Sequence, residues 1–224
     1  MSQSDPHRDE PILYDGRDLA SAQSAFIMLH GRGGSASDIL SVGRHLASEQ
    51  TALLAPQAAE DSWYPYSFLV PLTQNQPWLN SAMRRIAECV AQCVKANIPS
   101  ERVAIIGFSQ GACLATAFAA FNPTRYGGLI AFTGALPGPL GTSLDYPGEL
   151  RGTPILLSSG DPDPHVPWQR VEETEKAFTR MGAIVQATRH KGRPHTILSS
   201  ELLAAKQLLT TSSVISGSAM RANP

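Results

Sequence analysis

The residues best suited to catalysis lie in the segment Gly107-Phe108-Ser109-Gln110-Gly111, where a serine stands between two glycines. An apolar run at 103–106 precedes this segment, and small residues typical of a helix follow it to 121. The glycines predict a sharp strand-to-helix turn, because side chains there would collide with the neighbouring strand and helix. Such a turn exposes the Ser109 hydroxyl at a helix N-terminus, where the main-chain amide of Gln110 can stabilise an oxyanion. A Gly-x-Ser-x-Gly string also occurs in ordinary loops, so the strand and helix around it lead us to interpret Ser109 as a nucleophile.

A serine hydroxyl needs a base, and the base needs a group that orients it. Six histidines compete for the role of base. Five of them lie in the polar start, a glycine-rich loop, a surface helix, beside the candidate acids or at the end of the last strand (His7, His30, His45, His165 and His190). His195 is favoured because it ends the loop after the last strand and precedes a helix.

Two acids are candidates for the orienting group. Asp161 and Asp163 share one turn after an apolar strand at 154–158. Prolyl turns often use one aspartate to accept main-chain amides, so we expect one of the two to be structural. Asp163 stands farther out, between two prolines, and is favoured as the orienting acid. Because reactive groups gather at the carboxyl ends of parallel strands, Ser109, Asp163 and His195 are expected to meet there.

The rest of the chain alternates apolar strands with helical segments, which predicts a mostly parallel sheet covered by helices on both faces. The expected strands are 25–29, 51–55, 103–106, 128–132, 154–158 and 183–188, with a short edge strand at 11–14. The length of 224 residues fits one domain, expected at 25–209. Residues 1–24 form an N-terminal segment, of which 1–10 is expected to be disordered, and 210–224 form a tail.

Two loops bear on the substrate. Residues 61–78 concentrate aromatic side chains among prolines, so this stretch either covers a site or packs as a satellite of the core, and both remain open. The loop at 134–152 is too short and too broken by proline and glycine to be a cap domain. We expect the acyl group to lie between Trp63 and Tyr64 on one side and Leu136 and Trp168 on the other.

Composition excludes several classes of partner. A formal net charge of −1 without a basic run gives no basis for binding nucleic acid or an anionic membrane surface. No apolar stretch has signal-peptide or bilayer-spanning length, so the expected location is the cytoplasm and no membrane insertion is expected. Cys89, Cys93 and Cys113 are expected to be buried thiols and not a disulfide or metal site. No metal or cofactor is expected.

Several separate motifs between about residues 25 and 209 carry a resemblance to a known family. They are Leu29-His-Gly-Arg-Gly-Gly, Ala55-Pro-Gln-Ala, Trp63-Tyr-Pro, Gly107-Phe-Ser-Gln-Gly-Ala-Cys-Leu, Gly160-x-x-Asp163-x-x-Val-Pro and Gly192-x-x-His195. Together they resemble the phospholipase/carboxylesterase family of α/β-hydrolases, which includes the acyl-protein thioesterases. The resemblance implies a single-domain α/β-hydrolase fold without a cap.

The resemblance also implies roles for individual residues. Ser109 would be the nucleophile, His195 the base and Asp163 the acid, with the main-chain amides of Arg32 and Gln110 as the oxyanion hole. The expected activity is a serine carboxylesterase acting on short-chain acyl esters. Lysophospholipase or acyl-protein thioesterase activity, and a ligand-sensing protein of the same fold, are the alternatives.

The resemblance leaves two points open. Thioesterases of the family typically carry leucine at the Arg32 position, so this arginine is either a cation at the mouth of the acyl site or a solvated side chain that contributes only its backbone. Members of the family often form homodimers, which makes a homodimer possible here.

Overall fold

The computed structural model describes residues 5–211. Its strands are β1 (Ile12–Gly16), β2 (Ser24–Leu29), β3 (Thr51–Pro56), β4 (Val103–Phe108), β5 (Gly128–Phe132), β6 (Pro154–Asp161) and β7 (Ile184–Lys191). Its α-helices are α1 (Ala36–Leu46), α2 (Trp78–Lys95), α3 (Gln110–Phe121), α4 (Trp168–Arg180) and α5 (Ser199–Thr211). The strands predicted from the sequence are all present, with bounds that differ by at most three residues.

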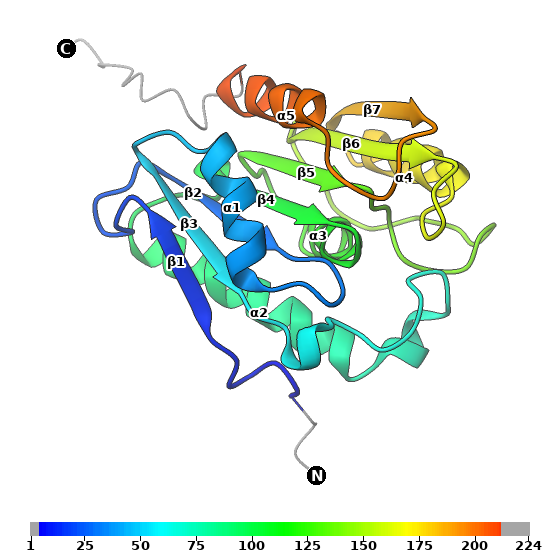
Figure 1. The fold of residues 1–224 in the computed structure, drawn as a ribbon, viewed down its shortest axis with the longest axis horizontal. Coiled ribbons are helices and arrows are strands. Elements are labelled where there is room, and N and C mark those ends of the chain that lie inside the picture. The colour runs from blue at the N-terminus through cyan, green and yellow to red at the C-terminus, as the bar shows by residue number, and fades with distance from the viewer. Residues whose placement is uncertain (1–4, 212–224) are drawn as a thin grey trace.

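The strands form one sheet in the order β1-β3-β2-β4-β5-β6-β7 (Figure 1). Only β1 is antiparallel to its neighbour, and all the other pairs are parallel. The chain leaves β2 toward one edge through α1 and β3, and then returns through α2 to β4 on the other side of β2. This reversal places the loops after β2 and β4 next to each other at the carboxyl ends of the strands, where α/β sheets form their clefts.

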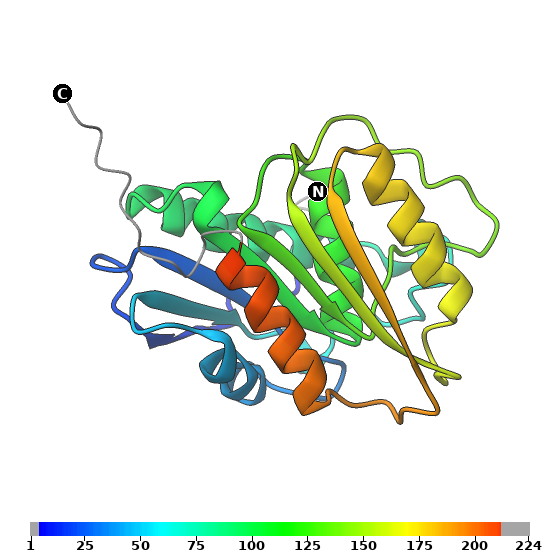
Figure 2. The same cartoon turned by 90° about the horizontal axis from the view of Figure 1, so that it is seen from above.

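Helices cover both faces of the sheet, as Figures 1 and 2 show. Side chains of α1 and α5 pack with one face, in a cluster that includes Phe26, Ile106 and Phe132. Side chains of α2, α3 and α4 pack with the opposite face, around Ile105 and Leu129. Strands that are buried on both faces read as continuous apolar runs, which is why β2, β4 and β5 could be recognised in the sequence.

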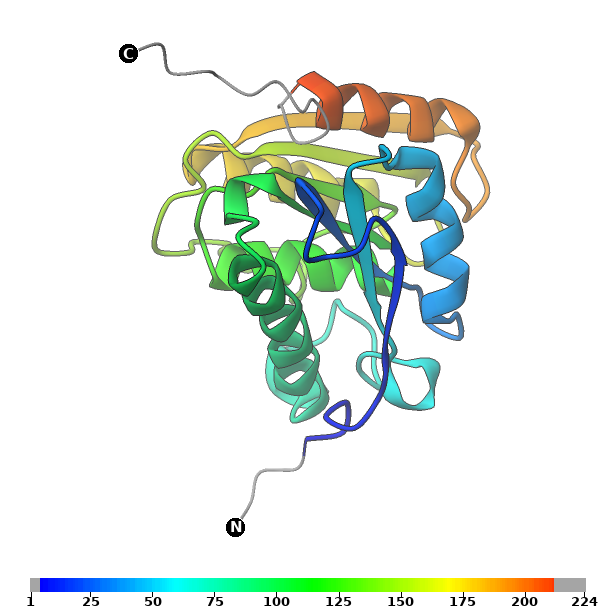
Figure 3. The ribbon, with the colours of Figure 1, turned by 90° about the vertical axis from the view of Figure 1, so that its left-hand side faces the viewer.

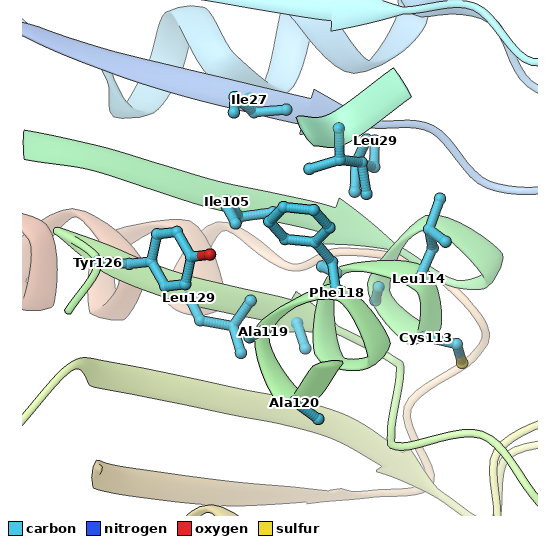
Figure 4. Close-up of a cluster of buried hydrophobic side chains, with 14 of the residues drawn as sticks. Ile27, Leu29, Ile105, Cys113, Leu114, Phe118, Ala119, Ala120, Tyr126 and Leu129 are labelled. Atoms are coloured by element: carbon cyan, nitrogen blue, oxygen red, sulfur yellow. The ribbon is translucent and has the colours of Figure 1, made fainter. Parts of the chain in front are cut away.

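Helix α3 is the most deeply buried helix of the described chain, and Figure 4 shows several of its side chains in the core beside the sheet. Residues 110–120 are all buried. Phe118 lies near Ile105 and Leu29, while the small Ala119 and Ala120 let the helix approach the sheet closely (Figure 4). A helix that is apolar all round must be covered on every side, and this cover holds its N-terminus in place beside β4.

The N-terminal segment corrects one expectation. Within residues 5–10, His7 is fully buried against the rest of the chain, whereas Arg8 and Asp9 are exposed. Strand β1 runs along the outer edge of the sheet beside β3, as Figure 3 shows. Contacts with the rest of the chain therefore hold part of the segment that was expected to be disordered, and the domain bounds of 25–209 stay a prediction. The polar composition of residues 5–10 concealed this, because their buried contacts are made by single side chains and not by an apolar run. Most of the expected C-terminal tail, 212–224, lies outside the described residues.

The stretch at 134–152 is a loop between β5 and β6, so no cap domain is inserted at this point. Among residues 5–211, no helix combines the length and apolar character needed to cross a bilayer.

Candidate active site

Ser109 occupies a tight turn between β4 and α3. Its φ of 53° and ψ of −117° lie outside the regions that most residues adopt. A Cβ at Gly107 would approach the carbonyl oxygen of Gly111 to 2.3 Å, and one at Gly111 would approach the carbonyl oxygen of Leu29 to 2.2 Å. Only glycine fits at either position, which confirms the steric reason for this motif.

A continuous chain of hydrogen bonds joins Ser109 to His195 and Asp163. His195 Nε2 is 2.8 Å from Ser109 Oγ, and His195 Nδ1 is 2.8 Å from Asp163 Oδ2. The three side chains come from the loops after β4, β6 and β7. Because the carboxylate accepts from Nδ1, the Nε2 lone pair faces the serine hydroxyl and can receive its proton.

The Asp163 side chain is fully buried, yet its charge is well supported. Burial by itself would raise the pKa of Asp163, but the hydrogen bond with His195 and those from the amides of His165 and Val166 outweigh it, so the pKa is lowered. Asp161 instead pairs with Arg189 on β7, and its carbonyl accepts from Gly192 N just after that strand, so its contacts join the end of β6 to β7.

Two main-chain amides lie beside the serine. Arg32 follows Gly31, at which a Cβ would lie 3.4 Å from Ser109 Cβ, and Gln110 is the first residue of α3. Neither amide donates to a group within residues 5–211. The Gln110 side chain is turned away from the serine, because Oε1 accepts from Trp63 N at 2.9 Å and Nε2 donates to Tyr64 O at 2.8 Å.

A cavity of about 560 Å³ opens in front of Ser109 and His195. Its wall comes mainly from the segment after β3 and from the turn after β6. The lining residues are Arg32, Tyr64, Pro65, Tyr66, Ser67, Phe68, Leu69, Ser109, Gln110, Cys113, Pro164, His165, Val166 and His195. The aromatic stretch therefore has both of the functions considered from the sequence, since Trp63 packs in the core and residues 64–69 line the cavity.

Of the four side chains expected to contact substrate, only Tyr64 lines this cavity. Trp63 is fully buried and donates from Nε1 to His30 O at 2.9 Å, and Leu136 is also in the core. Trp168 binds Glu172 through Nε1, and the Arg189 guanidinium lies over its ring. Sequence proximity to the site could not reveal these orientations, because Trp63 contacts His30 and Trp168 contacts Arg189, both distant in the chain.

Cys113 and His165 line the cavity, although the sequence analysis gave neither of them a role there. Cys113 is one helical turn after Ser109, a spacing that places both on one face of α3. His165 packs edge-on against His195 with ring centroids 5.1 Å apart. The Cys113 thiol is buried, and burial raises its pKa to about 12, which leaves it uncharged at neutral pH.

The Arg32 side chain is exposed, but it contributes more than its backbone to the structure. Its guanidinium donates to the carbonyl oxygens of Pro65 at 3.0 Å, Tyr64 at 2.8 Å and Tyr66 at 2.9 Å. Arg32 therefore ties the wall of the cavity to the loop after β2.

A buried polar cluster supports the loop that carries His195. Glu201 Oε1 accepts from Ser158 Oγ at 2.7 Å, and Oε2 accepts from Leu198 N at 2.9 Å. Arg193 Nε lies 3.3 Å from Glu201 Oε2, without the alignment of a hydrogen bond. His190 Nε2 is 2.9 Å from Ser158 Oγ. Because Ser158 Oγ donates to Glu201, His190 Nε2 donates to Ser158 Oγ. His190 is therefore part of this cluster and does not bond to Ser109.

Two further histidines are buried beside Trp63. His7 Nδ1 accepts from Ala59 N at 3.0 Å, and His30 Nε2 accepts from Ala58 N at 3.1 Å. Each imidazole donates its other N–H to a carbonyl, His7 to Trp63 and His30 to Gly31. Burial lowers the pKa of both, so both are neutral at pH 7.

Comparisons with known proteins agree with this architecture. A family model described as phospholipase/carboxylesterase matches residues 18–213. The crystal structure of a phospholipase/carboxylesterase from Dyadobacter fermentans is 42% identical and superposes with a TM-score of 0.86, covering 90% of this chain and 97% of that one.

Curated relatives are more distant. Acyl-protein thioesterase 1 of Eremothecium gossypii is 28% identical over 179 residues, which is 70% of this chain and 74% of the relative. An Arabidopsis thaliana protein named probable carboxylesterase SOBER1-like is 26% identical over 199 residues, covering 81% of this chain and 76% of the relative. The chain thus resembles both thioesterases and carboxylesterases.

Proposed function

Because this chain belongs to the phospholipase/carboxylesterase family of hydrolases, we propose that it is a serine carboxylesterase that hydrolyses short-chain acyl esters. The observation that carries this proposal is the unbroken chain Ser109–His195–Asp163, with both hydrogen bonds at 2.8 Å. A nucleophile, a base and an orienting carboxylate in that order can transfer an acyl group to serine.

In the proposed reaction Ser109 Oγ attacks the ester carbonyl while His195 Nε2 takes the hydroxyl proton. The amides of Arg32 and Gln110 would stabilise the oxyanion of the tetrahedral intermediate. His195 then gives the proton to the leaving oxygen as its bond to the acyl carbon breaks. Water, deprotonated by His195, attacks the acyl-enzyme and releases the acid and free Ser109.

The preference for short acyl chains is supported by the burial of side chains in and near the cavity. Cys113 and Tyr64 line it and are each at most 2% exposed, and Trp63 and Leu136 are fully buried. Each buried methylene stabilises the bound chain by about 0.8 kcal/mol only while space remains. We expect kcat/KM for 4-nitrophenyl esters, kept below their critical micelle concentrations, to be highest between acetyl and hexanoyl. A maximum at lauroyl or beyond would favour the lysophospholipase or acyl-protein thioesterase alternative.

The decisive experiment replaces the nucleophile. Ser109→Ala should lower kcat on any accepted ester by roughly 10⁴- to 10⁶-fold without changing the fold measured by circular dichroism. Ser41→Ala, at an exposed serine of α1, is the matched control and should retain full turnover. A serine-reactive phosphonate should label Ser109 in the wild-type protein. Retention of more than a few per cent of turnover by pure Ser109→Ala protein would reject this mechanism.

The thioesterase alternative has one specific point in its favour, the similarity to acyl-protein thioesterase 1. Matched oxygen and thiol esters of one acyl group separate the two activities through their kcat/KM ratio. A ligand-sensing role predicts a single burst of product with no further turnover, whereas the proposed enzyme turns over repeatedly.

A further inference from the structure

Arg32 is the only residue with a permanent charge among those that line the active-site cavity within residues 5–211. No aspartate or glutamate lines the cavity in that part of the chain, and the other ionisable lining groups include His165 and His195. Asp163 is nearby, but its side chain is fully buried and bonded to His195. The cavity thus combines apolar walls with an excess of positive charge.

Arg32 also differs from most other arginines of the described chain in its partners. Seven of them pair with a carboxylate, whereas no carboxylate of residues 5–211 lies within ion-pair distance of Arg32. Asp61 approaches the loop of Arg32, because its carbonyl accepts from Gly33 N. Its carboxylate, however, is bonded to Gln57 Nε2 at 2.9 Å. The positive charge of Arg32 therefore has no counterion from the described protein.

Three neutral carbonyls hold the guanidinium in place without neutralising it. They come from the consecutive residues Tyr64, Pro65 and Tyr66, which also line the cavity. A guanidinium has five N–H donors, so some remain for a ligand. Much of the conformational entropy of the side chain is already lost, which reduces the cost of binding an anion there. Guanidinium groups match carboxylates in geometry and charge.

The chemistry of the reaction indicates which part of a substrate would meet Arg32. His195 must protonate the leaving oxygen, so the leaving group lies on the side of His195 and His165. The acyl group then extends away from His195 into the cavity, whose lining includes Arg32 and the residues 64–66 to which it is bonded. The Arg32 amide would hold the carbonyl oxygen of the substrate. The guanidinium of the same residue therefore lies within the length of one arginine side chain of that oxygen. An acyl chain of a few methylenes spans such a distance.

We propose that the cavity selects acyl groups that end in a carboxylate, so that the substrates are monoesters or monothioesters of short dicarboxylic acids, with Arg32 binding the free carboxylate. This inference rests on the proposed function, because it assigns the acyl specificity of the same site. It also accounts for an arginine at a position where a purely apolar acyl pocket has no use for a charge.

The test compares two esters of nearly equal shape. 4-Nitrophenyl hemiglutarate carries a terminal carboxylate, and 4-nitrophenyl 5-methylhexanoate carries an isopropyl group in its place. The wild-type protein should have a kcat/KM at least about tenfold higher for the hemiglutarate, after correction for spontaneous hydrolysis, as expected for a charge-assisted contact. This ratio should fall as ionic strength rises from 0.01 to 0.5 M, because salt screens the contact.

Arg32→Met should abolish the preference, and Arg32→Lys should restore part of it. Any effect of losing the three carbonyl bonds acts on both esters alike, so their ratio reports the charge alone. Arg102→Met, which removes an exposed arginine outside the cavity, is the control and should leave the ratio unchanged. A wild-type ratio near one, or an Arg32→Met ratio equal to that of the wild type, overturns the inference. Turnover of the neutral ester that is lost in Ser109→Ala would still support the proposed function in that case.

Discussion

Replacement of Glu201 by glutamine tests how the protein holds its proposed base in position. The Glu201 side chain is completely buried, and that of Arg193 is 2% exposed, so the two charges face each other away from solvent. Glutamine has nearly the same volume and can still accept from Ser158 Oγ or Leu198 N. It removes the negative charge, however, and leaves the Arg193 cation buried without a counterion.

The expected cost follows from these contacts. Removing one partner of a buried ion pair typically costs 3–5 kcal/mol. Arg193 keeps hydrogen bonds to Thr133 Oγ1 and to the carbonyls of Pro194 and Thr196, which favours the lower end, about 3 kcal/mol. For a chain of this size, that loss lowers Tm by roughly 6–12 °C. Because Arg193 and His195 share a loop, kcat should also fall while His195 remains present.

Urea unfolding and calorimetry of Glu201→Gln measure the loss directly. Glu49→Gln, an exposed glutamate without an ion pair among the described residues, is the matched control and should change the free energy of unfolding by less than about 0.5 kcal/mol. The double variant Glu201→Gln/Arg193→Met should lose less than the sum of the single variants, since it removes both charges. A loss below about 1 kcal/mol in Glu201→Gln, with unchanged kcat, would refute this reasoning.

Three further outcomes are expected. Asp163→Asn should lower kcat by up to about 10⁴-fold, whereas Asp161→Asn, whose partner Arg189 is exposed, should cost at most about 1 kcal/mol of stability. If kcat fell more in Asp161→Asn than in Asp163→Asn, the acid would be misassigned. Burial lowers the folded-state pKa of His7 and His30, so below pH 6.5 the unfolded chain binds more protons and the free energy of unfolding should fall, by up to about 1.4 kcal/mol per pH unit for each histidine. Urea unfolding between about pH 7.5 and 5.5 should show a smaller dependence of this free energy on pH for His7→Gln, and an unchanged dependence contradicts the prediction. The three cysteines should resist Ellman's reagent in the folded protein and react after unfolding, because burial raises the pKa of Cys113 and of the other two to about 12; rapid labelling of any native thiol would disagree.

The sequence was sufficient for features that depend on local pattern. Apolar runs and the residues that interrupt them predicted the parallel sheet, because burial of a strand on both faces leaves a continuous signal in the chain. The glycines around Ser109 could be interpreted from the expected sharp turn, although the steric limit at Gly111 comes from Leu29 on β2 and only that at Gly107 comes from the turn itself. The expected contact of Ser109, Asp163 and His195 was argued from loops that follow parallel strands, and the resemblance to the family implied the same three residues.

Side-chain direction depended on the tertiary structure. Trp63 and Tyr64 are adjacent, yet Trp63 is enclosed by His7 and His30 and Tyr64 lines the cavity. His7 looked like part of a polar tail, and its burial depends on Ala59 and Trp63, more than fifty residues away. The carbonyls that hold Arg32 are likewise over thirty residues distant in the chain. Contacts of this range arise only when the sheet brings its loops together, so composition and spacing carry no trace of them.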